Sequence, residues 1–213
     1  MRRVRLAVLL SSFTLGAPLV SAQLPQATAT PVKWAPGEKL RITGIPNVGK
    51  ITDQLYRGAQ PRPGTLEQLK KIGITTIVDL RGEDSSVRDQ EKKEAEALDI
   101  HFVSIPVSGF TPPSSDQIAQ FLSLFGEKSA KIFVHCRLGE DRTGVFVATY
   151  RMTMQKWPAD EAIKEMYFFG YNGFWHRAMT SYVRRFPALL SSTPALATLS
   201  GAQAALPAAA QAN

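Results

Sequence analysis

The segment Lys131–Gly144, with the sequence KIFVHCRLGEDRTG, constrains the possible folds of this chain more than any other stretch. Its apolar beginning predicts a buried strand that ends at His135 and Cys136, and the residues from Arg142 onward predict a long buried helix. Cys136 is the only cysteine of the chain, and five residues separate it from Arg142. A buried strand followed by a short loop and a helix is typical of α/β proteins, which bind ligands at the carboxyl ends of parallel strands.

The loop between this strand and this helix is suited to bind a tetrahedral oxyanion. The first turn of a helix leaves amides unpaired, and these amides bind anions and favour a thiolate at Cys136. Arg142 can bind two phosphate oxygens bidentately, and Gly139 permits a tight backbone path. Thr143 is expected to donate a hydrogen bond to the sulfur, and Gly144 to let the helix pack closely against the loop. The expected phosphate-binding residues are Arg137, Leu138, Gly139, Glu140, Thr143 and Gly144.

These residues predict a two-step reaction. Cys136 attacks phosphorus, and water then releases phosphate from the phospho-cysteine. Because Arg142 and the loop amides stabilise the charge, neither a metal nor another cofactor is expected. His135 is expected to order the loop rather than to transfer protons. His101 and His176 carry no motif, and we expect them to be structural.

The spacing of Cys136 and Arg142 resembles the Cys-x5-Arg signature of the cysteine-dependent protein phosphatases. Together with LYRGAQP at 55–61 and LKKIGITTIVDLRGE at 69–83, the segment is similar to the atypical dual-specificity phosphatases of plants, fungi and bacteria. The similarity extends over about residues 52–187. It implies a phosphatase domain whose substrate is a phosphotyrosine, phosphoserine or phosphothreonine protein, or a small phosphorylated metabolite or lipid such as an inositol phosphate.

Four further positions follow from this resemblance. Family members that prefer inositol phosphates often carry a lysine where this chain has Glu140, although Arg137 restores one positive charge. Arg57 and Arg81 are expected either to line the mouth of the pocket or to form surface salt bridges.

The proton donor for the leaving group has several candidates. In this superfamily it is usually an aspartic acid on a separate loop, but the loop SGFTPPSSD has no carboxylate before Asp116. Asp116 is expected in the first turn of a helix, where it complements the helix dipole. The arrangement Cys-x4-Asp-Arg resembles myotubularin-like and Sac-type lipid phosphatases, which implies Asp141 as the donor, with a purely structural role at the helix start as its alternative. Glu140 comes next, followed by Glu83 and Asp84.

Two other functions are compatible with the sequence. The beginning of the loop, Cys136–Gly139, resembles that of a rhodanese-like sulfurtransferase, whose loop is shorter by one residue. A non-catalytic phosphate-binding module would result if Asp141 were held structurally and no acid reached the leaving group.

The first 22 residues are typical of a secretory signal peptide. Arg2, Arg3 and Arg5 precede an apolar stretch, and small residues end at Ala22. We therefore expect an exported protein, periplasmic or secreted, without stable membrane insertion after signal cleavage. The formal charge of +7 belongs partly to this signal, and no basic run with interleaved aromatic residues follows it, so a nucleic-acid partner is not expected.

Composition divides the rest of the chain into a flexible lead-in at 23–43, a phosphatase domain at 44–188 and a disordered Ala/Pro-rich tail at 189–213. The expected fold is a single α/β domain with a mostly parallel central sheet flanked by helices. A hairpin at 45–57 is expected to turn at Val48–Lys50. The patterns predict strands at 74–80, 101–107 and 131–136, and helices at 65–72, 87–98, 115–126, 142–157, 159–168 and 174–187.

Overall fold

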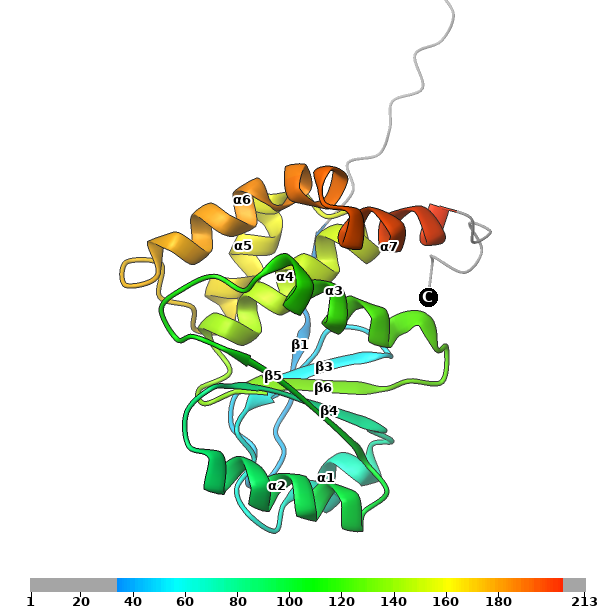
Figure 1. Ribbon diagram of the computed structural model, residues 1–213. Helices are drawn as coiled ribbons and strands as arrows, with labels where there is room; N and C mark the ends of the chain where they lie inside the picture. The colour runs from blue at the N-terminus through cyan, green and yellow to red at the C-terminus, as the bar shows by residue number, and fades with distance from the viewer. Residues whose placement is uncertain (1–33, 205–213) are drawn as a thin grey trace, which may run out of the picture. The chain divides into compact units, whose positions relative to one another are not determined.

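A computed structural model of the chain describes residues 34–204. Residues 1–33 and 205–213, which include the expected signal peptide at 1–22, lie outside the described residues (Figure 1).

The described residues form a six-stranded sheet with the order β1-β2-β3-β6-β4-β5. Strands β1, β2 and β3 are antiparallel neighbours, whereas β3, β6, β4 and β5 pair in parallel. The predicted mostly parallel sheet is therefore confirmed. The strands are β1 (Glu38–Lys39), β2 (Gly49–Lys50), β3 (Leu55–Ala59), β4 (Thr76–Arg81), β5 (His101–Val107) and β6 (Ile132–Cys136).

Helices cover both faces of the sheet, which explains why β3, β4 and β6 are buried along their whole length (Figure 1). One face carries α1 (Leu66–Lys71) and α2 (Ser85–Ala97). The other carries α3 (Ser115–Ser123), α4 (Asp141–Met154), α5 (Ala159–Phe168), α6 (Arg177–Ser192) and α7 (Pro194–Ala204), with a short 3₁₀ turn at Leu124–Gly126. None of these helices is long and apolar enough to span a membrane.

Local signals set several of these boundaries as predicted. After α1, Gly73 has a φ of 84°, in the left-handed region that glycine adopts without strain. Before α3, Ser114 and Gln117 form a reciprocal capping box, which fixes the start of that helix. Helix α4 is buried nearly all round, as its continuous apolar sequence predicts.

The hairpin predicted at 45–57 is present, but its turn lies later than expected. Lys50, expected in the turn, pairs with Tyr56 inside the sheet. The amide of Ile51 donates to the carbonyl of Leu55 at 2.9 Å, so the chain reverses between those two residues.

The disordered tail expected from residue 189 is wrong for residues 189–204. Helix α6 continues to Ser192, and α7 follows it directly. Leu196 is fully buried, and Leu189 and Leu199 pack against the same core. Alanine is a strong helix former, so the composition of this segment is compatible with a helix once its leucines find a core to cover.

The flexible lead-in expected at 23–43 is wrong for its described part, 34–43. The ring of Trp34 lies 5.5 Å from that of Trp157. The amide of Gly37 donates to Oε1 of Glu165 at 2.7 Å. These contacts reach residues more than a hundred positions away, which local composition does not reveal.

Candidate active site

Cys136 is the last residue of β6, which lies between β3 and β4. The cysteine is 3% exposed. Three parallel strands end at the edge of the sheet where the loop after Cys136 begins. The sequence predicted a ligand at this position.

The loop after Cys136 binds the rest of the protein through its carbonyl groups. The carbonyl of Arg137 accepts from the amide of Gln60 at 3.3 Å. Nδ2 of Asn47 donates to the carbonyls of Leu138 at 3.3 Å and Gly139 at 3.1 Å. Among the described residues no acceptor binds the amides of four loop residues, Arg137, Leu138, Gly139 and Glu140.

Helix α4 continues this series of free donors. It begins at Asp141, and the residue before it, Glu140, makes no side-chain cap hydrogen bond. Unpaired amides of a loop and of an uncapped helix start form a ring that binds an anion. We call this ring, with Cys136 and Arg142, the anion cup.

Gly139 is required by the backbone of the anion cup. Its φ is 69°, and a Cβ there would lie 2.4 Å from the carbonyl oxygen of Gly58 and 2.5 Å from the amide nitrogen of Ala59. Any larger residue would be strained and would push the loop away from the end of β3. The glycine predicted from the sequence thus has a defined steric role.

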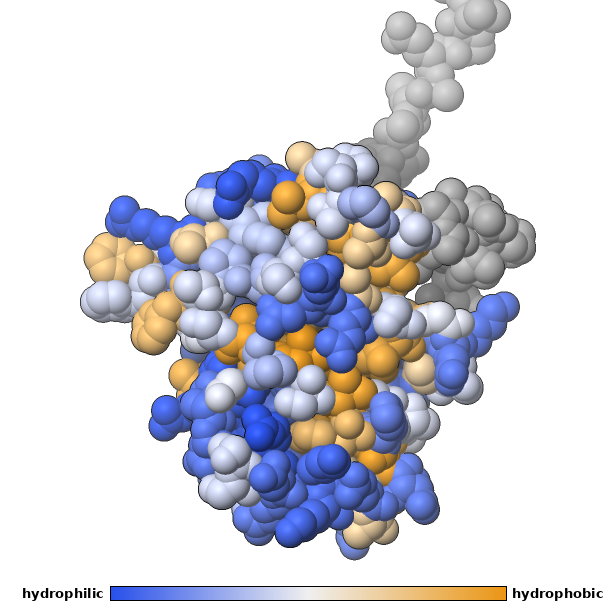
Figure 2. Space-filling view, viewed as in Figure 1, coloured by the Kyte–Doolittle hydropathy of each residue, from blue (hydrophilic) through white to orange (hydrophobic). Residues whose placement is uncertain are grey.

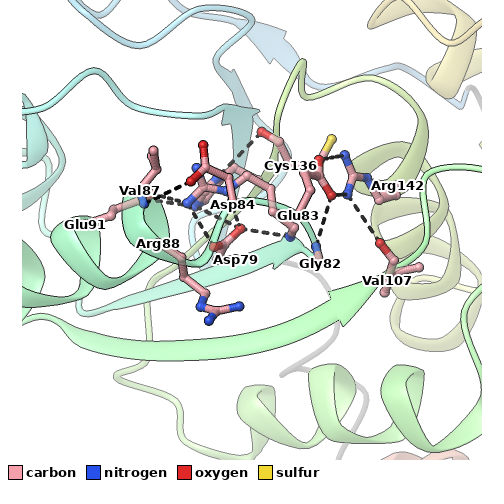
Figure 3. Close-up of polar contacts among 12 residues, drawn as sticks. Asp79, Gly82, Glu83, Asp84, Val87, Arg88, Glu91, Val107, Cys136 and Arg142 are labelled. Carbon is pink, nitrogen blue, oxygen red and sulfur yellow. Dashed lines mark hydrogen bonds and ion pairs between the residues drawn. The ribbon is translucent and has the colours of Figure 1, made fainter.

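The guanidinium of Arg142 is held by Glu83, which follows β4. Nη1 donates to Oε2 at 2.8 Å, and Nη2 donates to Oε1 at 2.7 Å (Figure 3). Nη1 also donates to the carbonyl of Val107 at 3.3 Å. Of the five N–H groups of the guanidinium, the Nε–H and one Nη2–H have no partner among the described residues. These two parallel donors form an edge that can bind two phosphate oxygens, and the sulfur of Cys136 lies beside this group in Figure 3.

The charges of Glu83 and Arg142 stabilise each other. The hydrogen bonds from Arg142 lower the pKa of Glu83 to about 2, so Glu83 is ionised at neutral pH and is not a proton donor. Burial lowers the pKa of Arg142, but the hydrogen bonds to Glu83 and the charges of Cys136 and Glu83 outweigh this effect, and the pKa lies above its ordinary value. Arg142 is therefore a fixed cation beside the nucleophile.

Arg57 lies beneath the anion cup rather than at the pocket mouth or in a surface salt bridge, so both sequence expectations for it are wrong. It is fully buried, its Nη2 donates to the carbonyl of Gly139, and its guanidinium carbon lies 4.2 Å from the ring centre of Phe169. Burial lowers its pKa to about 10, and the charges of Glu165 and Cys136 oppose this shift. Arg57 remains a cation at neutral pH and supports the loop from inside.

Arg81 is also buried, in an ion-pair network that includes His135. Nε and Nη2 of Arg81 donate to the two carboxylate oxygens of Asp79 at 2.8 and 2.9 Å, and Nη2 donates to Glu91 at 2.6 Å. Nε2 of His135 lies 3.0 Å from Oε1 of Glu91, and its Nδ1 lies 3.4 Å from the carbonyl oxygen of Cys136. His135 thus contacts the backbone of Cys136, and its role in ordering the loop stays a prediction. Arg81 takes neither of its expected surface roles.

Asp79, Glu91 and His135 also offer ligand atoms that lie within 4.8 Å of one another. The sequence did not indicate this group because its members come from β4, α2 and β6. The guanidinium of Arg81 already binds both carboxylates. A metal ion would have to displace this cation, so the group fits a buried ion-pair network better than a metal site.

Asp141 faces the loop between α5 and α6. Its Oδ2 lies 3.4 Å from Nε2 of His176, and its Oδ1 accepts from the amide of Asn172 at 3.4 Å. The ring of Phe110, from the loop after β5, stacks on His176 with 5.9 Å between the centroids. His176, expected to be merely structural, is therefore in contact with the leading candidate for the proton donor.

The other acidic candidates have separate places. Burial, and then the charge of Asp141, raise the pKa of Glu140, whose side chain lies against Gly170. Asp116 is exposed in the first turn of α3, where it complements the helix dipole. Asp84 caps α2 by accepting from the amide of Val87 at 3.4 Å.

Two expectations for the helix start need correction. The hydroxyl of Thr143 is fully buried but has no partner among the described residues, so the expected hydrogen bond to the sulfur is absent. Gly144 faces α5 rather than the loop, because a Cβ there would lie 3.3 Å from the side chain of Met166. The glycine thus permits close packing of α4 on α5.

The sequence did not reveal three contacts of this site. Glu83 pairs with Arg142, Asn47 donates hydrogen bonds to the loop, and His176 contacts Asp141. Glu83 could have been found, since the ends of adjacent parallel strands meet at one edge, and it follows β4 as Arg142 follows β6. Asn47 and His176 lie in irregular segments whose position no periodic pattern predicts.

Comparisons with known proteins agree with this geometry. A family model described as "DSP-PTPase phosphatase fused to NAD+ Kinase" matches residues 33–181. The dual specificity protein phosphatase TpbA of Pseudomonas aeruginosa is 28% identical over 165 residues, which cover 77% of this chain and 70% of that protein.

Solved structures share the fold. The crystal structure of P. aeruginosa TpbA has a TM-score of 0.60 at 23% identity and covers 79% of this chain and 96% of that one. The core catalytic domain of the PP-IP phosphatase SIW14 from S. cerevisiae has a TM-score of 0.59 at 17% identity and covers 73% of this chain and 98% of that one.

Proposed function

The chain belongs to the phosphatase family whose model is described as "DSP-PTPase phosphatase fused to NAD+ Kinase", and we propose that it hydrolyses phosphoric monoesters through a phospho-cysteine at Cys136. One observation carries this mechanism. The carbonyls of the loop bind outward to Asn47 and Gln60, while its amides are unpaired beside a buried thiol. Amides without an acceptor at the start of a helix bind anions, so such a loop is suited to bind an oxyanion.

In the first step the thiolate of Cys136 attacks phosphorus. A sulfur–phosphorus bond forms, the bond from phosphorus to the leaving oxygen breaks, and that oxygen takes a proton. The free edge of Arg142 binds two of the remaining phosphate oxygens, and the loop amides bind the charge that develops on them. Glu83 holds Arg142 in this orientation, so the guanidinium need not reorganise during the reaction.

In the second step a water molecule attacks the phospho-cysteine. The sulfur–phosphorus bond breaks, inorganic phosphate leaves, and Cys136 returns to a thiolate. The hydroxyl of Thr143 makes no hydrogen bond to the resting thiol and has no partner among the described residues, and we propose that it donates to the sulfur only as the sulfur departs. Residues of this chain thus supply a nucleophile, anion binding and leaving-group assistance.

We propose Asp141 as the donor that protonates the leaving oxygen. It stands at the start of α4, next to Arg142, and is partly exposed. Asp84 and Glu83 have other partners, and Asp116 lies in the first turn of α3. Glu140 is the alternative, since its raised pKa also suits a proton donor.

The substrate class that these findings support is a phosphorylated protein or an inositol phosphate. TpbA bears the description of a dual specificity protein phosphatase, and SIW14 that of a PP-IP phosphatase. In this chain the cup carries one exposed cation, Arg137, next to the partly buried acid Glu140. An acid at that position disfavours a polyanionic inositol phosphate and favours a singly phosphorylated group.

We also propose that the protein is exported, either to the periplasm or to the medium. The proposal is supported by the basic residues, apolar stretch and small residues before Ala22. Cell fractionation and amino-terminal sequencing test it. A chain that begins at Gln23 outside the cytoplasm is the expected result, and a cytoplasmic chain that retains the apolar stretch would contradict export.

The mechanism is tested with Cys136→Ser and with two phosphate esters. The variant is expected to lose turnover and to retain binding of inorganic phosphate. Wild-type protein should hydrolyse both an aryl phosphate and an alkyl phosphate. Turnover of the aryl ester alone would mean that no acid reaches the leaving group, and phosphate binding without any turnover would indicate a binding module.

A further inference from the structure

The exposed large hydrophobic side chains of residues 34–204 lie on segments around the anion cup or at the adjoining end of α5. Leu138 belongs to the cup itself, Phe110 to the loop after β5, and Phe174 and Trp175 to the loop before α6. The outermost are Phe110, Trp175 and Phe174, which are 78%, 73% and 68% exposed. The full set is Phe110, Leu138, Tyr167, Phe168, Phe174 and Trp175, called the apolar rim below.

Contacts join these segments to one another. Phe110 stacks on His176, and His176 lies 3.4 Å from Asp141 at the start of α4. Asn47 donates to Gly139 in the cup and to the carbonyl of Phe169 at the end of α5, at 3.1 and 2.9 Å. The space-filling view shows apolar side chains projecting at the edge where β5 ends and α6 begins (Figure 2). The rim is therefore one surface around the phosphate site.

Cations accompany the apolar rim. The guanidinium of Arg177 lies 5.5 Å from the ring centre of Phe174, and Nζ of Lys39 lies 4.6 Å from that of Phe168. Arg137 is exposed next to Leu138.

The acids of the cup contact partners other than these cations. Glu83 binds Arg142, and Asp141 faces His176. Glu140 lies against Gly170, and burial, followed by the charge of Asp141, raises its pKa, which disfavours its charged form. The exposed charges paired with the rim are thus positive.

We infer that the apolar rim docks on an anionic phospholipid bilayer, so that the phosphomonoester head group of a lipid enters the anion cup. Aromatic side chains paired with lysine or arginine are favoured at the boundary between lipid and water. Each cation near an anionic surface adds further attraction. This inference rests on the proposed phosphatase function and adds a lipid phosphomonoester to the substrates considered for it.

The shape of the rim favours a bilayer over a peptide. A peptide docks in a groove or along a sheet edge, where its side chains enter pockets. Two hollows of the described residues lie away from the rim: one is lined by residues 60–66 and α2, the other by α2 and β5. Aromatic side chains that project as far as Phe110, Phe174 and Trp175 match a fluid layer into which they can insert.

Trp175 supplies a direct probe of docking. The chain has three tryptophans, of which Trp157 is buried and Trp34 half-buried, so Trp175 is the exposed one. The mature chain from Gln23 onward, with Cys136→Ser, is mixed with vesicles of phosphatidylcholine alone, with phosphatidylglycerol, or with phosphatidic acid. We expect a blue shift of tryptophan emission and co-sedimentation with both anionic vesicles but not with phosphatidylcholine alone. Absence of both signals with phosphatidic acid would overturn the inference.

Substitutions in the rim test vesicle binding independently of catalysis. Phe174→Ser with Trp175→Ser is expected to weaken vesicle binding, measured by sedimentation, by about tenfold or more. Arg177→Gln should weaken it about fivefold, whereas Arg185→Gln, an exposed position farther along α6, serves as the matched control. Equal binding by the double variant and the wild type would overturn the proposed surface.

Turnover distinguishes failure of this inference from failure of the proposed function. With Cys136 intact, the double variant should release phosphate from phosphatidic acid vesicles at a much lower rate than the wild type, while both hydrolyse soluble p-nitrophenyl phosphate equally. Wild-type turnover of the soluble ester without lipid turnover would refute only the lipid substrate. A rim that instead binds a phosphotyrosine peptide, with no vesicle binding, would identify a protein partner and refute the bilayer. No turnover of any ester would refute the phosphatase mechanism itself.

Discussion

Removal of the Arg81 guanidinium is expected to destabilise this domain severely. The side chain makes three hydrogen bonds, of 2.8 and 2.9 Å to Asp79 and 2.6 Å to Glu91. Arg81→Met keeps a similar apolar stem but leaves two carboxylates, 0% and 6% exposed, without their cation. Breaking a buried ion pair costs about 3–5 kcal/mol. Because a domain is stable by about 5–15 kcal/mol, the variant should be close to unfolding.

Urea denaturation at neutral pH measures this loss as a change in the free energy of unfolding. Lys92→Met is the matched control, since Lys92 forms an exposed pair with Glu96 at 3.8 Å. Its effect should stay within about 0.5 kcal/mol. A loss below about 1 kcal/mol for Arg81→Met would refute the conclusion that this network supports the site.

A compensated variant tests whether unpaired buried carboxylates cause the loss of stability. If the cost comes from unpaired buried carboxylates, then Asp79→Leu and Glu91→Leu in the Arg81→Met background should recover most of the stability, because replacing a whole buried network by apolar residues is often neutral. A triple variant less stable than Arg81→Met alone would show that the carboxylates have other essential partners.

Three further changes test the cup. Gly139→Ala places a Cβ 2.4 Å from a backbone oxygen at a φ of 69°, so calorimetry should show lost binding of inorganic phosphate, and unchanged binding would contradict the cup geometry. Asp141→Asn should slow alkyl phosphates by about 10²–10⁴ and aryl phosphates much less, whereas equal losses would reassign the proton donor. Glu83→Gln should lower kcat/KM about tenfold by loosening Arg142. Since the pKa of Glu83 is lowered to about 2 from 4.5, its ionised form stabilises the fold above pH 4.5, and this contribution is lost as pH falls toward 2. Glu83→Gln should therefore lose less stability than the wild type over this range, and equal acid sensitivity would refute the pairing.

The central part of the fold follows from local patterns. The apolar runs that form β4, β5 and β6 and the spacing from Cys136 to Arg142 predict a parallel sheet with a loop at its edge, and the structure has both. Strand β5 and helix α5 have the predicted bounds. These elements were predictable because buried strands and helices carry apolar residues in continuous or periodic runs.

The remaining features depend on contacts between distant residues. Arg57 and Arg81 are charged, which favours surface positions by composition, yet both are buried, because the carbonyl of Gly139 accepts from Arg57, and Glu91 of α2 joins Asp79 around Arg81. The composition of the α7 segment is typical of disorder, but Leu196 is buried in the hydrophobic core. Such pairings are set by tertiary structure, which single-sequence periodicity does not encode.

The identity of the general acid shows the same limit most clearly. The motif brings Asp141 next to Arg142 in the sequence, but the contact with His176, 35 positions away, exists only in the folded chain. Likewise, nothing in the segment around Glu83 reveals that it fixes Arg142, until β4 and β6 are seen as parallel neighbours.

Trapping the intermediate tests the proposed chemistry most directly. Wild-type protein is mixed with an aryl phosphate, quenched in acid during turnover and digested, and the peptides are weighed by mass spectrometry. One added phosphoryl group is expected on the peptide that carries Cys136, and none in Cys136→Ser. Steady turnover with every cysteine-containing peptide unmodified, or with the phosphoryl group on another residue, would contradict nucleophilic attack by this sulfur.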